Sequence, residues 1–559
     1  MKRNWYSMNP RLNLAICQFG ILVFFLILSG FISTFYGKDL SWDFANYHYY
    51  NPYSFLWHRT DFDYWPVSFI HIYFNPAADF FTYYLINHFS PWHSVFISGA
   101  IHGINGWLIF LIANRFLQSK NKPATGIDRD HFPAFIFAMI LSILGLYSAM
   151  IFPSIGDFKN DNIVCIFVLY FVYLQIMIWD RFSAEKIFSY RFFILSAVVL
   201  GIGAGIKLTA AVFVIGSLMT VLILPIHLRD RCNYFFLLAC FSFIGILISS
   251  GYWMLILWGK FHNPLFPFFN NIFHSPNFPP INFHYSQYTP ANLWQALLYI
   301  FTLSWHGSGI SDEIFRDFRF AIIALLFISF GLVRGGQKLS GHKNQKITLP
   351  EYWLFGFMIS SFIAWEFYFS IIRYITPIAL LTPLCIFLLA KKLISNLLFR
   401  SVFLFCIYTV MIVCMVLPIS VRMPRYETSF FNVKLPYGID RIKNATVLIA
   451  YPEYALNNVP KPQTYLIPFF PHNWRFLGIP FTNEHRAALH SIDKKKILER
   501  VSFYDKPFYL LTSGESMHEL KQVAASLGLM QIGDCKNIYS DRQMASRSET
   551  LLCPAIKRR

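Results

Sequence analysis

The sequence is poor in charged residues for its length. Asp, Glu, Lys and Arg make up 14% of the 559 residues, whereas a soluble globular domain carries about 25%. Hydrophobic residues account for 55% of the chain, and the mean hydropathy is +0.45. The composition therefore excludes an ordinary water-soluble protein and predicts a polytopic protein that contacts a lipid bilayer.

Several catalytic motifs are missing as well. The sequence has no His-Glu-x-x-His, no paired Cys-x-x-Cys and no Walker loop, so zinc-protease and nucleotide-triphosphatase functions lack support. Asp61 and Asp63 resemble a cation-binding pair, but two carboxylates rarely complete a metal site. We therefore expect no cofactor, and a divalent metal is unsupported. Most cysteines fall in apolar runs; whether Cys535 and Cys553 form a disulfide is left open.

Positive charge is in excess, with a formal net charge of +18, but its distribution argues against a nucleic-acid partner. Lys and Arg gather in alternate short loops between apolar runs, which is the positive-inside pattern of membrane proteins. The long stretch 35–91 is poor in cations and contains only Lys38 and Arg59. We therefore expect a cytoplasmic N-terminus, a retained first span and stretch 35–91 on the opposite side of the cell (inner or plasma) membrane.

Apolar runs long enough to cross a bilayer, about 17–25 residues, recur along the chain. Lys207 and Leu208 alone separate two of them, which form either a tight hairpin or one broken helix. Segment 292–304 could add a short or re-entrant helix. The sequence therefore predicts an α-helical polytopic membrane protein of about eleven transmembrane helices, near residues 12–34, 92–116, 132–152, 162–179, 192–206, 209–228, 233–256, 318–334, 352–369, 374–390 and 402–420.

Two segments outside the spans are long enough to fold by themselves. Within residues 1–420, the first extracytoplasmic loop, 35–91, is predicted to hold two surface helices near 43–57 and 76–89, since Tyr and Trp are typical of a membrane interface. Polar residues return in the segment 421–559, which we predict to be an extracytoplasmic α/β domain. Its expected strands and helices are Val447–Tyr451, Pro507–Leu511, 484–501 and 514–528.

The loops on the predicted outer face carry most of the unusual polar residues. Asp43 stands just past the first span in an aromatic and amide-rich run, and charges at a membrane edge are functional candidates. Each has a simpler interpretation. Asp43 could cap a surface helix, Lys207 could reach lipid headgroups, Arg373 could be a headgroup anchor, and Asp157 and Asp161 could end a span.

This pattern resembles the GT-C superfamily of integral-membrane glycosyltransferases. Members have a long first extracytoplasmic loop with two surface helices and a catalytic acid soon after the first span, the position of Asp43 here. The run Gly-Ile-Gly-Ala-Gly-Ile-Lys-Leu-Thr at 201–209, the run Asn-Pro-Leu-Phe-Pro-Phe-Phe-Asn at 263–270 and the pair Arg373-Tyr374 are also similar to bacterial members. The resemblance covers roughly residues 10–420 in architecture, and its motifs are short.

The resemblance implies a polyprenyl-phosphate sugar as donor and an extracytoplasmic glycan, lipid or protein as acceptor. Many members carry adjacent acids in the first loop, whereas Asp43 is flanked by Trp42 and Phe44, which favours a single base in an inverting transfer. Lys207 and Arg373 would hold the donor phosphate. The expected substrate-binding residues are Trp42, Asn46, Tyr47, His48, Asp157, Asp161 and Asn263.

Two other functions stay open at this stage. A polysaccharide polymerase or ligase would use the same lipid-linked substrates on the same side of the membrane. A secondary transporter would also have broken helices and membrane charges, but its charges would lie near the bilayer midplane and its sequence would often repeat. Here the charges fall at span ends and no repeat is visible, so a transporter is the weaker alternative.

Overall fold

The computed structural model describes residues 10–64, 71–118, 132–282, 288–305, 314–339, 346–419, 421–424, 426–451, 464–480, 495–501, 507–514, 517–540 and 549–558. It is mostly helical, with a β-rich C-terminal part. The chain divides into two compact units. The helical unit comprises residues 1–35, 96–251 and 284–420, and the sheet unit comprises 36–95, 252–283 and 421–559. This division groups the first long loop with the C-terminal segment.

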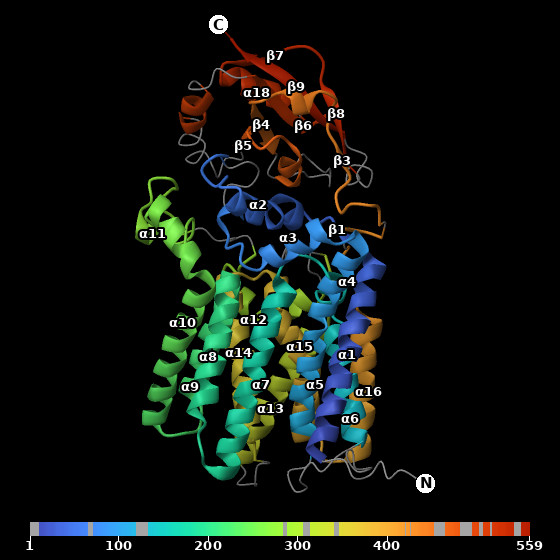
Figure 1. Ribbon diagram of the computed structural model, residues 1–559. Helices are drawn as coiled ribbons and strands as arrows, with labels where there is room; N and C mark the ends of the chain where they lie inside the picture. Colours follow the sequence, from blue (N-terminus) through green and yellow to red (C-terminus); the bar gives the residue numbers. More distant parts are fainter. Residues whose placement is uncertain are drawn as a thin grey trace, which may run out of the picture. The chain divides into compact units, whose positions relative to one another are not determined.

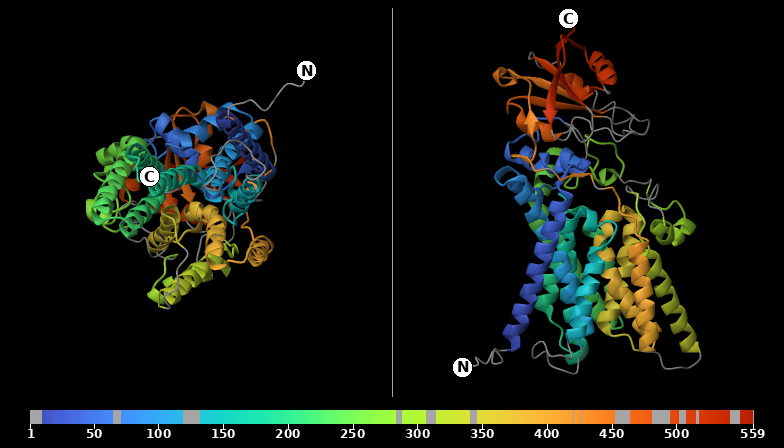
Figure 2. Two further views of the ribbon diagram at one scale, coloured as in Figure 1. Left: turned by 90° about the horizontal axis from the view of Figure 1, so that it is seen from below. Right: turned by 90° about the vertical axis from the view of Figure 1, so that its right-hand side faces the viewer.

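Long apolar helices form the helical unit, and they run side by side in Figures 1 and 2. Within the described residues, six helical stretches are long and apolar enough to cross a membrane, and five shorter helices are also apolar. They are compatible with a multi-pass membrane protein. The helices are α1 (Pro10–Tyr36), α4 (Pro91–His102), α5 (Ile104–Leu117), α6 (Phe132–Leu146), α7 (Asp161–Glu185), α8 (Tyr190–Ile206), α9 (Ala211–Ile223), α10 (Leu228–Phe261), α12 (Leu293–Trp305), α13 (Arg319–Leu339), α14 (Leu349–Tyr368), α15 (Thr376–Leu393) and α16 (Leu397–Val413).

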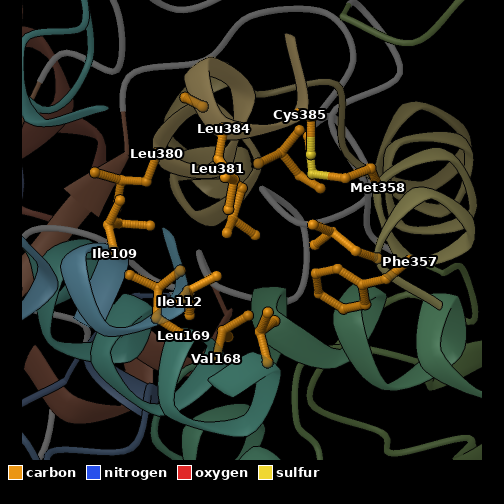
Figure 3. Close-up of a cluster of buried hydrophobic side chains, with 14 of the residues drawn as sticks. Ile109, Ile112, Val168, Leu169, Phe357, Met358, Leu380, Leu381, Leu384 and Cys385 are labelled. Atoms are coloured by element: carbon orange, nitrogen blue, oxygen red, sulfur yellow. The ribbon is translucent and has the colours of Figure 1, made fainter. Parts of the chain in front are cut away.

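The core of the helical unit lies among α5, α7, α14 and α15. Aliphatic and aromatic side chains from these four helices interdigitate there (Figure 3). Apolar helices in lipid associate through the van der Waals contacts of closely packed side chains, and the packing seen here favours the association of the four helices. Those labelled in Figure 3 are Ile109, Ile112, Val168, Leu169, Phe357, Met358, Leu380, Leu381, Leu384 and Cys385.

The predicted span near 92–116 is one helical stretch, Pro91–Leu117, in which α4 and α5 meet at Gly103. The backbone of Gly103 is itself helical (φ −60°, ψ −22°). A Cβ atom at Gly103 would collide with the carbonyl group of Phe25 in α1, so only glycine allows this close approach. The run at 190–223, in contrast, is two helices, because Lys207 adopts an extended conformation between α8 and the short 3₁₀ turn Leu208–Ala210.

A mixed β-sheet forms the core of the sheet unit. Its strand order is β3-β8-β9-β6-β4-β5, with β7 paired to β9. The pairs β4–β5 and β4–β6 are parallel, and the remaining pairs are antiparallel. Val447, Leu448 and Ile449 are completely buried, as expected for a strand covered on both faces. The strands are β3 (Val433–Lys434), β4 (Thr446–Tyr451), β5 (Arg475–Pro480), β6 (Phe508–Ser513), β7 (Leu529–Gln531), β8 (Lys536–Ser540) and β9 (Thr550–Lys557).

The C-terminal predictions are confirmed in part. Strands β4 and β6 fall at the two predicted positions, and α18 (Met517–Ser526) lies within the predicted helix 514–528. Of the predicted helix 484–501, residues 495–501 are helical, and 484–494 lie outside the described residues. The structure joins Cys535 and Cys553 in a disulfide, which answers the question that the sequence left open.

The predicted surface helices are shorter than expected. The first divides into a π-helix at Phe44–His48 and α2 (Tyr50–Leu56), and the second is α3 (Asp79–His88). A separate two-stranded sheet pairs β1 (Lys38–Asp39) with β2 (Arg422–Met423). Segments far apart in the sequence are therefore joined within the sheet unit.

A buried ion pair makes a second junction of this kind in the sheet unit. Arg59 donates to both carboxylate oxygens of Asp63, at 2.7 and 2.8 Å, and to the carbonyl oxygens of His472 and Trp474, both at 2.6 Å. Asp63 also accepts from Tyr50 Oη at 2.7 Å and from the Phe476 amide at 2.9 Å. Burial raises the pKa of Asp63, while the Arg59 guanidinium and the two other donors oppose that rise. We call these residues the Arg59 cluster.

Candidate functional site

Asp43 lies at the start of the π-helix in the sheet unit. Its side chain is 8% exposed, its backbone is helical (φ −58°, ψ −50°), and its carboxylate makes no capping hydrogen bond to the helix. Simple helix capping therefore does not explain this residue. A π-helix of this length is rare and often marks a functional site.

Aromatic rings surround the start of the same segment. Trp42 is 47% exposed, and its indole meets the rings of Tyr47 and His71 edge-on, at centroid distances of 6.3 and 5.3 Å. Tyr47 stacks on His71 at 4.9 Å and is almost fully buried. Trp42 is thus the accessible member of a supported aromatic group, and an exposed, fixed indole can pack against the apolar face of a sugar ring.

Asn46 has an amide oriented by the backbone. Its Nδ2 donates to the carbonyl oxygen of Trp42 at 2.9 Å, and its side chain is completely buried. In the part of the chain that the structure describes, no donor reaches Asn46 Oδ1. Since a buried amide oxygen without a donor costs about 1–3 kcal/mol, this atom is a candidate acceptor for a ligand hydroxyl.

His48 forms a buried pair that the sequence did not indicate. Its Nδ1 lies 2.8 Å from Oδ1 of Asp79, the first residue of α3, and both side chains are almost fully buried. The carboxylate orients the imidazole and favours the tautomer with a proton on Nδ1. The pair connects the π-helix to α3, although 31 residues separate its members, and no local motif links them.

Asn263 holds its own loop together in the sheet unit. Its Nδ2 donates to the Phe268 carbonyl oxygen at 2.9 Å, and its Oδ1 accepts from the Leu265 amide at 2.9 Å. The residue is completely buried, and its neighbour in the loop, Asn270, donates to three backbone carbonyl groups. Both ends of the Asn263 amide are therefore engaged inside the loop, and we assign this side chain a structural role.

In the helical unit, Lys207 and Arg373 share one aromatic ring. Lys207 Nζ lies 5.2 Å from the centroid of the Tyr374 ring, and Arg373 Cζ lies 5.5 Å from the same centroid. Lys207 also pairs with Asp161 Oδ1 at 2.5 Å and donates to the Lys159 carbonyl oxygen at 3.1 Å. The side chains of Lys207 and Asp161 remain 16% and 12% exposed. We call Asp161, Lys207, Arg373 and Tyr374 the Lys207 cluster.

The turn before α7 positions Asp161, and its geometry requires particular residues. Gly156 has a φ of +78°, and a Cβ atom there would collide with Ser33. Its amide donates to Nδ1 of His102 at 2.8 Å. Asn160 follows with a φ of +66°, a conformation that Asn tolerates better than most residues. Asp157 is buried within this turn, at 5% exposure, so it supports the turn more readily than it contacts a ligand.

The candidate residues thus fall into two groups. Asp43, Trp42, Asn46, Tyr47 and His48 belong to the sheet unit. Asp157, Asp161, Lys207 and Arg373 belong to the helical unit.

Asp79 was not among the site residues expected from the sequence. Tyr374 was noted there only as part of the pair Arg373-Tyr374, without a role of its own. Among the described residues, no three His, Cys, Asp or Glu side chains are grouped as they would be around a metal ion.

Comparison with known proteins adds no relative. The chain matches no family model, no curated protein and no solved structure.

Proposed function

We propose that this chain is a multi-pass membrane glycosyltransferase that moves a sugar from a polyprenyl-phosphate donor to an extracytoplasmic acceptor. The observation that carries the proposal is the Lys207 cluster, in which two cations from separate segments share one ring and stay partly exposed. A phosphate that must stay at a membrane edge needs this kind of cationic support.

The exposed apolar surface of the helices supports a position in the membrane. Only 22% of the most apolar stretch of α10 and 17% of that of α13 is buried inside the protein. Large apolar side chains on several helices are exposed, among them Leu255 at 74%, Leu332 at 72% and Phe405 at 73%. Apolar surface of this extent is unfavourable in water and suits a lipid environment. We propose about eleven spans in the cell membrane, a cytoplasmic N-terminus and an extracytoplasmic C-terminal domain, on the alternation of cation-rich loops.

The proposed reaction needs one base and a stabilised leaving group. Asp43 removes the proton of the acceptor hydroxyl as its oxygen attacks the anomeric carbon from the side opposite the lipid phosphate, which inverts that centre. The bond from the anomeric carbon to the phosphate oxygen breaks, and the lipid phosphate leaves with its electron pair. Lys207 and Arg373 stabilise the charge that develops on it, and Asp161 orients Lys207.

Remaining side chains of the Asp43 segment would contact the sugar or acceptor. Trp42 offers an exposed ring, Asn46 an oriented amide oxygen, and His48 an imidazole fixed by Asp79. Tyr47 supports Trp42 and His71 from a buried position. In this mechanism one carboxylate supplies the base, and two positively charged side chains supply the phosphate contacts.

The experiment that tests the proposal uses purified protein reconstituted in liposomes with a panel of polyprenyl-phosphate sugars and unlabelled acceptors. We expect one donor to be consumed, with one lipid phosphate released for each sugar transferred. Long polymeric products would support the polymerase or ligase alternative. Movement of a solute across the liposome without any broken glycosidic bond would support a transporter and contradict the proposal.

A further inference from the structure

The sheet unit contains a cavity of about 490 Å³ that the Asp43 segment does not line. This volume is typical of a small-molecule site. Its walls come from distant parts of the sequence: the turn at 60–64, Tyr73, the end of α10, Asn277 and the helical segment 495–501. A cavity assembled from so many segments depends on the fold of the whole unit.

Positively charged side chains line two walls of this cavity. Lys260 comes from the end of α10, and Lys496 and Arg500 come from the segment 495–501. Lys260 pairs with Asp61 at 2.9 Å, and Lys496 donates to Asn277 Oδ1. The Arg500 guanidinium lies 4.6 Å from the centroid of the Tyr64 ring. Each cation is therefore held in place by a neighbour that also lines the cavity.

The carboxylates of the cavity only partly offset these charges. Asp63 is neutralised by the two hydrogen bonds from Arg59. Among the described lining residues, Asp61 and Glu499 then face three positively charged side chains. Behind the wall, Arg475 lies 4.4 Å from the centroid of the Phe62 ring. Burial, followed by the charge of Arg500, lowers the pKa of Arg475. Positive charges are thus crowded here, and an anion would relieve their repulsion.

Other lining groups suit a ligand rich in hydroxyls. Asp61 and Glu499 accept hydrogen bonds, Asn277 can both donate and accept, and Tyr64 and Tyr73 add aromatic faces with polar ends. A purely apolar ligand would leave these polar groups without partners. A ligand with several negative charges would be repelled by the carboxylates of Asp61 and Glu499. The lining therefore favours a ligand with several hydroxyls and a single acidic group.

We propose that this cavity binds an acidic sugar residue, whose carboxylate or phosphate contacts Arg500 and Lys496 and whose hydroxyls contact Asp61, Glu499 and Asn277. The choice of a sugar rests on the proposed function, because an acceptor glycan needs a holding site. The preference for an anion rests on the cavity alone.

Equilibrium binding to purified full-length protein tests the proposal without requiring turnover. Isothermal titration or saturation-transfer NMR compares glucuronic acid, glucose 6-phosphate, glucose and inorganic phosphate. We expect one acidic sugar to bind at least about tenfold more tightly than glucose and phosphate, since a hydrogen bond to a charged group is worth about 1.5–3 kcal/mol. Whichever of glucuronic acid and glucose 6-phosphate binds more tightly shows whether the cavity prefers a carboxylate or a phosphate. Glucose or inorganic phosphate binding as tightly as the tighter of the two acidic sugars, or no binding of either acidic sugar, would overturn the proposal.

Substitutions in the cavity wall test whether the acidic sugar binds in this cavity. Arg500→Gln should weaken the acidic sugar about 10- to 100-fold and leave glucose unchanged, and Lys496→Gln provides a second variant in the same wall. Lys521→Gln removes an exposed lysine from α18 and should bind normally. Unchanged binding by both cavity variants would contradict the assignment. A donor panel that fails while the acidic sugar still binds would reject the proposed function but leave the cavity assigned.

Discussion

The Arg59 cluster and the Lys207 cluster both pair a cation with a carboxylate and place aromatic rings beside the cation, yet they differ in burial. The side chains of Arg59 and Asp63 are 3% and 1% exposed, and those of Lys207 and Asp161 are 16% and 12% exposed. Asp63 accepts from Arg59, Tyr50 and Phe476, and Arg59 donates further to two carbonyl groups of the C-terminal segment.

Burial and partners decide what each cluster can do. A buried pair whose charges are already engaged with each other and with backbone groups has no charge left to offer a ligand and chiefly holds segments together. A partly exposed cation keeps access to solvent and can exchange some of its contacts for those of an incoming phosphate. The comparison therefore teaches that charge alone does not mark a binding site. It favours a structural role for the Arg59 cluster and is the basis on which we propose binding at the Lys207 cluster.

The largest expected effect on folding comes from the Arg59 cluster. Asp63→Asn leaves the buried Arg59 guanidinium without its counter-charge and should lower the free energy of unfolding by about 3–5 kcal/mol. Denaturation of the full-length protein in detergent measures the change. Asp61→Asn is the matched control, because the Asp61 side chain is 80% exposed, and it should shift stability by less than about 1 kcal/mol. Equal losses in the two variants would remove the distinction between buried and exposed carboxylates.

The Lys207 cluster should respond in binding rather than in folding. Lys207→Met removes the charged contact that we propose to the donor phosphate. Such a contact is worth about 1.5–3 kcal/mol, so the variant should raise the Kd for the donor about 10- to 100-fold. Titration of a polyprenyl-phosphate sugar into detergent-solubilised protein measures that Kd. Lys207→Arg keeps the charge and should lose less. If the Lys207→Met protein binds the donor normally but loses as much stability as the Asp63→Asn protein, the Lys207 cluster has a structural role instead.

A smaller effect is expected at Tyr374, whose ring contacts both cations. A cation–π contact is worth about 0.5–2 kcal/mol, so Tyr374→Leu should raise the donor Kd about 2- to 30-fold. Tyr374→Phe keeps the ring and should bind within about twofold of the wild type. The same titration compares the two variants. Equal behaviour of Phe and Leu at this position would show that the ring does not support the cations.

Hydropathy predicted the helices well, because length and apolar composition determine whether a segment must be buried or lie in lipid. The need for glycine at position 103 escaped this criterion, since its cause is the nearby backbone of Phe25 in another helix. Likewise, β4 and β6 are apolar enough to identify, whereas β9 contains Pro554, a residue that argues against a strand in sequence.

The site was predictable only to the level of single residues. Asp43, Lys207 and Arg373 were singled out by their positions at span ends. The pairing of His48 with Asp79 and the bonds from Arg59 to His472 and Trp474 join residues far apart in sequence, and tertiary packing alone creates them. The pair Asp61 and Asp63 was noticed in the sequence, but the other walls of the cavity beside Arg500 come from distant segments, so no local motif predicted the cavity.

Turnover of Asp43 variants, measured with the accepted donor, tests the central claim most directly. If Asp43 is the general base, the Asp43→Asn substitution should lower turnover about 10²–10⁴-fold. Donor binding and folding should be preserved, because Asn has nearly the same shape as Asp. If Asp43 merely began the helix, Asn would be almost silent, while Ala would cost about 0.5–2 kcal/mol of stability. The account predicts an inactive, folded, donor-binding Asp43→Asn protein, and near-normal turnover of that protein would contradict it.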